Sequence, residues 1–295
     1  MKSRALILLA LAFAVIAPAA GDDFAAQIEA ARAQRVERLT RPDGWLTLVG
    51  LHFLPLGDSP VGRAPDNRVV LAAGPAHLGT ITLTPEGRVM FAPAPGVAAQ
   101  IDGQPARPGE LRPAAGDVPP MVLTSGTVSL VTIERGGRKA LRVKDSAAER
   151  RLHFPGLDYF PVDPGWRIEA QWVPFEPPRE VSITNIIGNV SRERVPGKAV
   201  FQRDGRTYEL WPLVEDPGDP LFFVFSDATG GSESHPMRFL DAAPPKNGRV
   251  VLDFNLATNP PCAFTPFATC PLPPPPNRLP LAVPAGERKY RGSQE

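Results

Sequence analysis

The sequence VVLAAGPAHLGTITLTPEGRVMFAPAPGVAAQI, residues 69–101, decides the fold of the first half of the chain. Short apolar, β-prone runs recur in it at nearly ten-residue spacing, and turn sequences such as Pro-Glu-Gly separate them. These runs lie at 69–71, 79–83, 89–91 and 97–101. Similar runs flank the stretch, at 45–54, 121–123, 128–133 and 140–143. The pattern is typical of a β-sandwich or a β-barrel.

A second β-rich segment follows, after a charged interruption near 145–165 that includes Glu149, Arg150 and Arg151. We interpret this charge cluster as a solvated loop or a short helix. The strands predicted beyond it lie at 168–173, 181–183, 198–202, 206–213, 221–225 and 249–254. Ahead of both segments, residues 22–39 place apolar side chains at helical spacing, which predicts one peripheral helix packed on a sheet.

We therefore expect a mostly β protein. The predicted units are a signal peptide at 1–20, a helix at 21–41, a β-sandwich at 42–150 and a second β-rich domain at 151–295. The chain has 37 prolines and 26 glycines in 295 residues, and these exclude a helical bundle because proline ends helix interiors. The balance of 32 Lys and Arg against 31 Asp and Glu gives no reason to expect nucleic acid as a partner.

The first twenty residues have the pattern of a secretory signal peptide. Lys2 and Arg4 precede an apolar run over 5–17, and Ala17-Pro18-Ala19 fits a small-x-small cleavage site. The run is short for a bilayer span, although a retained N-terminal anchor is the alternative. No later segment approaches a membrane helix in length and apolarity. These features predict a periplasmic or secreted protein.

Residues 260–280, called the strap below, contain nine prolines, including a run of four at 273–276. Proline ring geometry favours extended polyproline II in such a run. In an oxidising compartment, Cys262 and Cys270 predict a disulfide that holds the strap across the second domain. The alternative is a proline-rich ligand for a recognition domain. The chain contains no phosphate-binding glycine loop, Gly-x-Ser-x-Gly or His-Glu-x-x-His, so we expect no metal and no cofactor.

The longest unusual motif of the chain is NPPCAFTPFATCPLPP, which begins at Asn259. Further motifs are Gly44-Trp-Leu, Leu221-Phe-Phe-Val-Phe-Ser-Asp-Ala-Thr, Arg238-Phe-Leu, Asp253-Phe-Asn, Asn277-Arg-Leu and Ala285-Gly-Glu. Together these motifs resemble the bacterial DUF1684 family, whose function is unknown. The resemblance extends from about Gly44 to Tyr290 and implies an architecture but no reaction.

Residues 61–71, VGRAPDNRVVL, and the turn Ile101-Asp-Gly-Gln resemble a forkhead-associated β-sandwich over roughly 45–145. Modules of that kind bind phosphothreonine through an Arg and a Ser-Arg-x-His segment. This chain has Arg63, but Pro-Ala-His77-Leu-Gly stands where the segment is expected, so the phosphate-binding Ser is missing. The resemblance therefore implies the fold without phosphopeptide binding.

The strongest candidate site residues are Arg238, Asp253, Asn255 and Asn259, which all belong to family-like motifs. Asp253 and Asn255 are two apart on a predicted strand and are expected on one face. An Arg–Asp pair there joins two strands, and the asparagines bind the backbone of the strap. The alternative interpretation is a polar pocket for a carboxylate, sugar or peptide.

The loop at 226–238 supplies weaker candidates, Asp227 and His235, for a Ser/His/Asp catalytic group or an oxygen-ligated cation site. An ordinary polar loop is the simpler interpretation. The sequence thus favours an extracytoplasmic binding or structural module whose ligand is a small molecule, a glycan or a peptide. A secreted hydrolase with a polar site around Arg238, Asp253 and Asn255 is the alternative.

Overall fold

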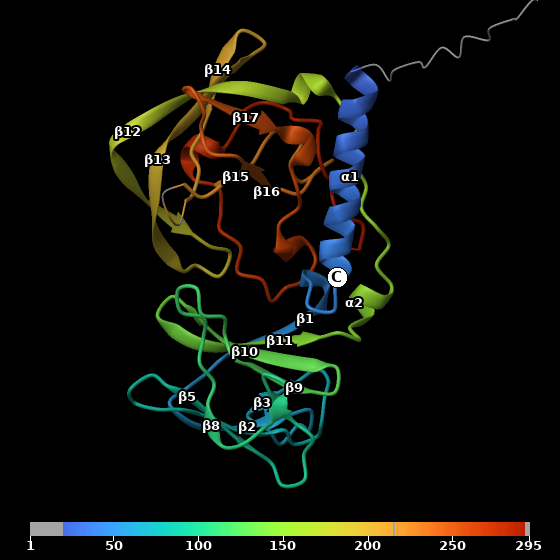
Figure 1. The fold of residues 1–295 in the computed structure, drawn as a ribbon, viewed down its shortest axis with the longest axis vertical. Helices are drawn as coiled ribbons and strands as arrows, with labels where there is room; N and C mark the ends of the chain where they lie inside the picture. Colours follow the sequence, from blue (N-terminus) through green and yellow to red (C-terminus); the bar gives the residue numbers. More distant parts are fainter. Residues whose placement is uncertain (1–19, 215, 217, 293–295) are drawn as a thin grey trace, which may run out of the picture.

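A computed structural model describes residues 20–214, 216 and 218–292. The predicted signal peptide lies almost wholly outside the described residues. Two β-rich lobes are stacked along the long axis of the molecule, and helix α1 (Ala20–Thr40) lies along the side of the C-terminal lobe (Figure 1). None of the helices in the described part of the chain has the length and apolarity needed to cross a membrane.

The N-terminal lobe consists of two sheets. Its strands are β1 (Leu48–Phe53), β2 (Gly57–Gly62), β3 (Val69–Val70), β4 (Gly79–Leu83), β5 (Val89–Pro93), β6 (Gln100–Ile101), β7 (Gln104–Pro105), β8 (Gly109–Glu110), β9 (Val122–Ser125), β10 (Val128–Arg135) and β11 (Arg138–Asp145). One sheet has six strands in the order β1-β11-β10-β9-β6-β7, and the other has five in the order β3-β2-β4-β5-β8. Because side chains alternate between the faces of a strand, each sheet turns one apolar face inward.

A single apolar core fills the space between these sheets. It includes Val61, Ile81, Phe91, Leu123 and Leu141. β10 shows how the sequence produces this arrangement, since Val128, Leu130 and Thr132 are buried while Ser129 and Val131 between them are only partly covered. The forkhead-associated resemblance of this lobe remains a prediction.

The C-terminal lobe follows a short helix, α2 (Glu149–Leu152). Its strands are β12 (Arg167–Thr184), β13 (Val190–Arg203), β14 (Arg206–Leu210), β15 (Leu221–Phe225), β16 (Arg238–Ala242) and β17 (Arg249–Asp253). The four-stranded sheet has the order β14-β13-β12-β17, and β15 pairs with β16. Short 3₁₀ helices lie at Trp45–Thr47, Pro164–Trp166, Phe254–Leu256, Pro261–Ala263 and Pro275–Asn277.

The chain after Phe254, called the tail below, includes the strap and forms no strand in the described residues. It closes the C-terminal lobe with its own side chains. Phe254, Leu279 and Val283 enter the apolar core. Asn277, fully buried, binds the backbone on both sides: its Nδ2 donates to the carbonyls of Trp211 (2.9 Å) and Val224 (2.8 Å), and its Oδ1 accepts from the Trp211 N–H (2.7 Å). The Asn277 amide thus supplies hydrogen-bond donors within a strap whose prolines have no backbone N–H.

The strap is not held by a disulfide in this structure, contrary to the sequence prediction. Cys262 and Cys270 are free cysteines. They are neighbours, and the Cys262 N–H donates to Sγ of Cys270 at 3.3 Å. Apolar burial and side-chain hydrogen bonds provide the anchoring instead, for example from Thr265 Oγ1 to the Leu48 carbonyl of the N-terminal lobe at 2.8 Å.

Candidate functional site

Arg238, the first predicted site residue, is a fully buried structural cation. Its partner is Asp227 rather than Asp253 as predicted: Nη2 and Nε donate to Oδ2 at 2.5 and 3.2 Å. Nη1 and Nη2 also donate to the carbonyls of Ala285 and Val283. Burial lowers the pKa of Arg238, and the adjacent Asp227 carboxylate opposes that shift. Both side chains are completely covered, so Arg238 fastens the tail to β16.

The loop containing Asp227 and His235 does not assemble a catalytic triad among the described residues. Oδ1 of Asp227 accepts from the N–H and the hydroxyl of Thr229, at 2.9 and 2.6 Å, and from the Val283 N–H at 3.1 Å. Ser234, itself fully buried, bonds to the Thr229 hydroxyl at 2.7 Å. The His235 ring contacts the Met237 carbonyl, not Ser234, and burial lowers its pKa. No group of three potential metal ligands occurs within the described ranges.

Asp253 and Asn255 form a turn instead of sharing a strand face, because β17 ends at Asp253. The Asp253 carboxylate accepts from the backbone and side-chain amides of Asn255 at 3.1 and 3.0 Å. Asn255 in turn exchanges two hydrogen bonds with the backbone of Asp163, both 2.9 Å. Asp253 also lies 3.7 Å from Arg167 Nε. The predicted strand, 249–254, extended one residue too far, and Asn255 lies in the 3₁₀ helix that follows.

Asn259 binds the end of the tail. Its Nδ2 donates to the Arg288 carbonyl at 2.8 Å, and its N–H donates to Glu287 Oε2 at 2.7 Å. Arg35 of α1 completes the cluster: Nε donates to Glu287 Oε1 and Nη2 to the Asn259 carbonyl, both at 2.9 Å. Glu287 is fully buried, and burial raises its pKa while Arg35 opposes the shift.

Of the predicted site residues, Asn255 lines a cavity. This cavity, about 180 Å³ in volume and called the α1 cavity below, lies between α1 and the tail. Arg32, Arg35 and Arg38 enter it from successive turns of α1, because residues three apart share a helix face. The rest of its wall comes from Ala31, Tyr159, Asp241, Asn255, Leu256, Ala257, Thr258 and Glu287.

Two buried polar atoms at the α1 cavity have no protein partner: the Tyr159 hydroxyl and Arg32 Nε. The other nitrogens of Arg32 are bound, Nη2 to the Phe160 carbonyl at 2.9 Å and Nη1 to Glu29 at 2.8 Å. Its guanidinium lies 4.3 Å from the centre of the Tyr159 ring. Burial, and secondarily Glu287, raises the pKa of Tyr159 far above its usual range, so its hydroxyl keeps the proton. Buried polar groups normally have partners, so this deficit marks the site.

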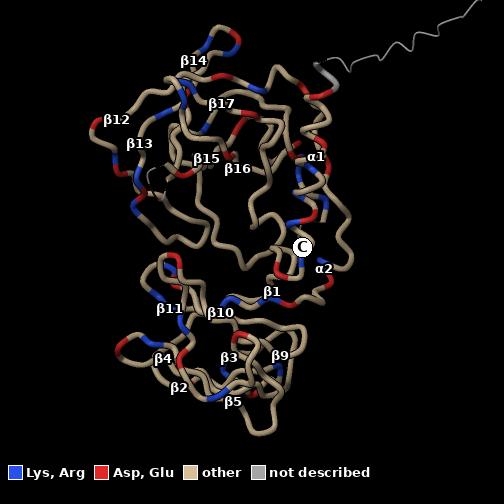
Figure 2. Tube along the Cα trace, in the orientation of Figure 1, with Lys and Arg blue, Asp and Glu red and all other residues tan. Residues whose placement is uncertain are grey.

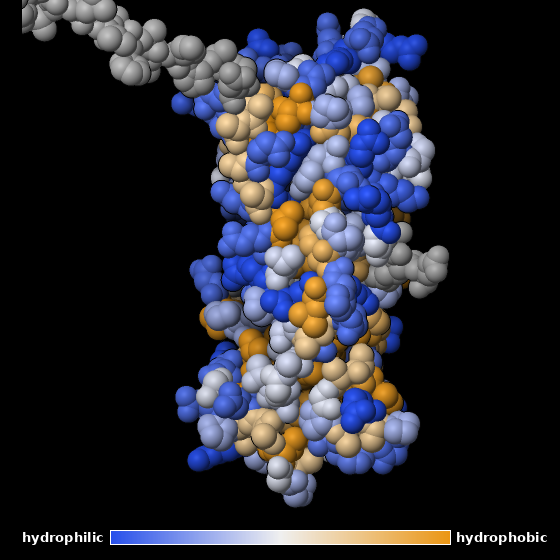
Figure 3. Space-filling view, turned by 90° about the vertical axis from the view of Figure 1, so that its right-hand side faces the viewer, coloured by the Kyte–Doolittle hydropathy of each residue, from blue (hydrophilic) through white to orange (hydrophobic). Residues whose placement is uncertain are grey.

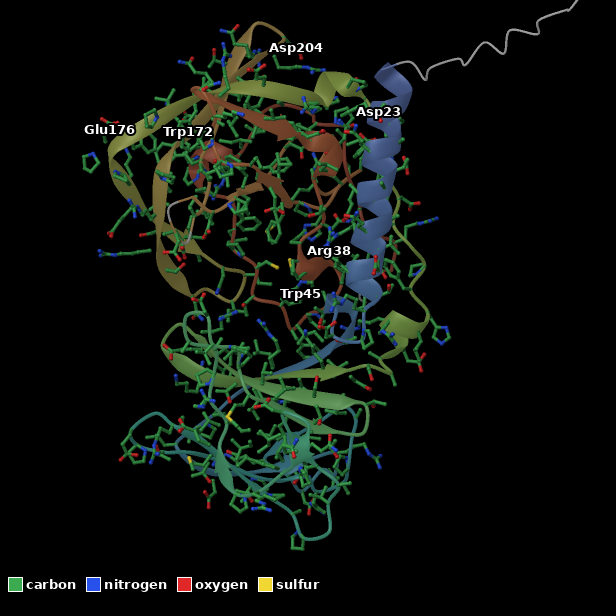
Figure 4. All side chains as sticks on the ribbon, in the orientation of Figure 1. Asp23, Arg38, Trp45, Trp172, Glu176 and Asp204 are labelled. Atoms are coloured by element: carbon green, nitrogen blue, oxygen red, sulfur yellow. The ribbon has the colours of Figure 1, made fainter. Side chains whose placement is uncertain are left out.

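A second hollow of about 350 Å³ shares Arg35 and Arg38 with the α1 cavity and reaches the N-terminal lobe. Arg41 and Lys144 also line it, and Lys144 Nζ donates to the backbone carbonyl of Asp43. Figure 4 labels Arg38 and Trp45 close together where α1 meets the lower lobe. The arginines of α1 all lie in its C-terminal half (Figure 2), and hydrophilic residues are mixed with apolar patches on the outer face of that side (Figure 3).

The site residues predicted from the sequence do not include Arg32, Arg35, Arg38 and Tyr159. A signal was present, since three arginines at spacings of three mark one face of the predicted helix. Glu287 was within a family-like motif but received no role. Gly286 beside it has φ +79°, and an added Cβ would lie 2.5 Å from the Ala257 carbonyl oxygen, so only glycine fits there.

The C-terminal lobe is thus a β-rich unit closed by a proline-rich tail, and its buried polar residues hold that tail. Residues 152–288 match the family described as "Protein of unknown function (DUF1684)". The chain belongs to this family through its second lobe. The predicted resemblance to this family is confirmed over residues 152–288, and its extension back to Gly44 stays a prediction.

The structural comparisons found an uncharacterized protein of Haloarcula marismortui, solved by solution NMR. It is 34% identical, the match covers 49% of this chain and 82% of that one, and the TM-score is 0.41. A crystal structure of Rad53 residues 1–466 with AMP-PNP matches at 9% identity, over 74% of this chain and 50% of that one, with a TM-score of 0.16. No curated protein matches the chain.

Proposed function

We propose that the protein is an exported binding module that holds a small molecule in the α1 cavity. Export rests on the signal-peptide pattern of residues 1–20, which predicts a periplasmic or secreted location. In this proposal the N-terminal sandwich, with its forkhead-associated-like motifs but without their phosphate-binding Ser, acts as a scaffold.

The observation that carries the proposal is the pair of buried, unpartnered groups at the cavity, the Tyr159 hydroxyl and Arg32 Nε. An unmet buried donor costs about 1–3 kcal/mol, which a bound ligand recovers. The residues predicted from the motifs, by contrast, are engaged with the protein itself: Arg238 with Asp227, and Asp253 with Asn255. They support the shape of the lobe and leave ligand contact to the α1 face.

The size of the cavity favours one of the ligand classes that the sequence left open. A volume of about 180 Å³ suits a small molecule better than an oligosaccharide or a peptide as the group inside. A glycan or peptide would contact only the rim.

Native mass spectrometry of protein purified from its exported compartment tests this proposal. The expected result is an added mass that is lost on denaturation, and that is also lost in Ala31→Phe, which fills the cavity from α1. Ala33→Phe places the same ring on the exposed face of α1 and is the matched control, expected to retain the mass. A wild-type protein without added mass, or an Ala31→Phe variant that retains it, contradicts the proposal.

A further inference from the structure

We propose that the α1 cavity binds a small oxyanion, a carboxylate or a phosphate group, between Tyr159, Arg32 and Arg38. This inference rests on the proposed binding function and names the chemistry of the ligand. It follows from three properties of the described residues: the kind of hydrogen-bonding group left unmet, the distribution of charge, and the route into the cavity.

The unmet buried groups are donors. Arg32 Nε is a donor only, and the Tyr159 hydroxyl carries a proton that no protein oxygen accepts. Both carboxylate oxygens of Glu287 already accept hydrogen bonds, from Arg35 and from the Asn259 N–H. One buried acceptor nearby, Asn259 Oδ1, has no donor, but Asn259 is not among the residues that line the cavity. A ligand that satisfies this wall must therefore present acceptors, and an oxyanion presents several.

The charges around the cavity also favour an anion. Arg35 is neutralised by Glu287, and Arg32 contacts Glu29, whose carboxylate is 63% exposed. Arg38 makes no ion pair or hydrogen bond within the described part of the chain. One acidic group opposes the proposal, the Asp241 carboxylate of β16, which lines the cavity and is influenced by Arg35 and Arg38. Removing its charge should strengthen binding.

The route into the cavity is basic. The adjoining hollow of about 350 Å³ is lined by Arg35, Arg38, Arg41 and Lys144, against the single acidic residue Asp43. Such a cationic approach raises the local concentration of anions and speeds their association at low salt. The two hollows share Arg35 and Arg38, so the basic hollow and the cavity adjoin along this face of α1.

Isothermal titration calorimetry with acetate, inorganic phosphate and acetamide tests the inference. Acetamide has the size of acetate without its charge. We expect saturable binding of acetate or phosphate that weakens as sodium chloride is added, with no binding of acetamide. The anion that binds with the higher affinity shows whether the ligand group is a carboxylate or a phosphate. Equal binding of acetamide, or no binding of either anion, overturns the inference.

Variants separate binding from folding. Tyr159→Phe removes only the unpartnered hydroxyl, so it should leave the melting temperature unchanged or raised while weakening the anion about tenfold, as expected for a hydrogen bond to a charged group. Arg38→Gln should weaken it about fivefold, and Asp241→Asn should tighten it about threefold. Arg206→Gln, an exposed arginine on β14, is the control and should change nothing.

The outcomes of the two experiments are distinguishable. If Ala31→Phe removes a retained mass but neither anion binds the wild-type protein, the binding function stands and the oxyanion is wrong. If Tyr159→Phe lowers the melting temperature and leaves anion affinity unchanged, the hydroxyl has a structural role and the inference is also overturned. If Asp241→Asn abolishes binding, the ligand requires that carboxylate and is not a simple anion.

Discussion

Neutralising Asp227 should destabilise the C-terminal lobe far more than neutralising Asp253. Asp227→Asn removes the only carboxylate that contacts Arg238 in the described residues, and both side chains of this pair are completely buried. Removing one partner of a buried ion pair costs about 3–5 kcal/mol because the remaining charge is left uncompensated. That is a large part of the roughly 5–15 kcal/mol by which a folded protein is stable.

The matched variant is Asp253→Asn. Its carboxylate lies at a turn, is 13% exposed, and is 3.7 Å from a half-exposed arginine. The asparagine retains an oxygen that accepts from the Asn255 amide, so the expected cost is about 1 kcal/mol or less. The two variants remove the same charge from two family-like motifs, which makes the burial of the partner the variable under test.

Urea unfolding followed by tryptophan fluorescence measures both values, since Trp166 lies in the core of this lobe. The unfolding slope m should stay the same in all variants. Adding Arg238→Met to Asp227→Asn should recover part of the loss, because it removes the uncompensated charge. A loss below about 1 kcal/mol for Asp227→Asn, or equal losses in the two single variants, would refute the reasoning.

Three further perturbations test the tail. Gly286→Ala should cost about 2–4 kcal/mol, whereas Gly57→Ala, with similar φ (+84°) and open space around it, should cost about 1–2; equal losses in thermal unfolding would contradict the steric explanation. Asn277→Ala should cost about 2–4 kcal/mol in urea, because three buried backbone groups lose their partner; a loss under 1 kcal/mol would show that water replaces the amide. The raised pKa of Glu287 contributes stability below the unfolded pKa near 4.5 that is lost as pH rises through the folded value, so the stability of wild type relative to Glu287→Gln should fall with rising pH; a pH-independent difference would contradict burial as the cause.

The strand pattern predicted the fold, but the sequence did not predict which polar residues pair with one another. Alternation in β10 and the Pro-Glu-Gly turn before β5 are local signals, so they predicted the sandwich and most strands. The partner of Arg238 is set by tertiary packing instead. Asp227 and Asp253 are both close to Arg238 in sequence. The tail selects Asp227, because Val283 of the tail binds both Arg238 and Asp227.

The site was missed for a related reason. Periodicity predicted α1 but gave no role to the three arginines on one of its faces, because nothing local shows that the tail returns with Glu287 to cover that face. Asn255 was named for the motif it belongs to, and it lines the cavity through the turn that follows β17 rather than through the predicted strand face. Motif residues therefore located the neighbourhood of the cavity without identifying the groups that line its polar wall.

The proline-rich tail explains why so many arginine and asparagine side chains gather here. Prolines keep their carbonyls but lack N–H groups, so the strap and the chain around it have more acceptors than backbone donors. Side chains supply the missing donors: Arg238 to Val283, Arg35 to Asn259, and Asn277 to Val224. At the α1 cavity two of these donors, Arg32 Nε and the Tyr159 hydroxyl, have no carbonyl partner. The side-chain donors that bind the tail therefore also leave, at the α1 cavity, the hydrogen-bond donors that we propose bind an anion.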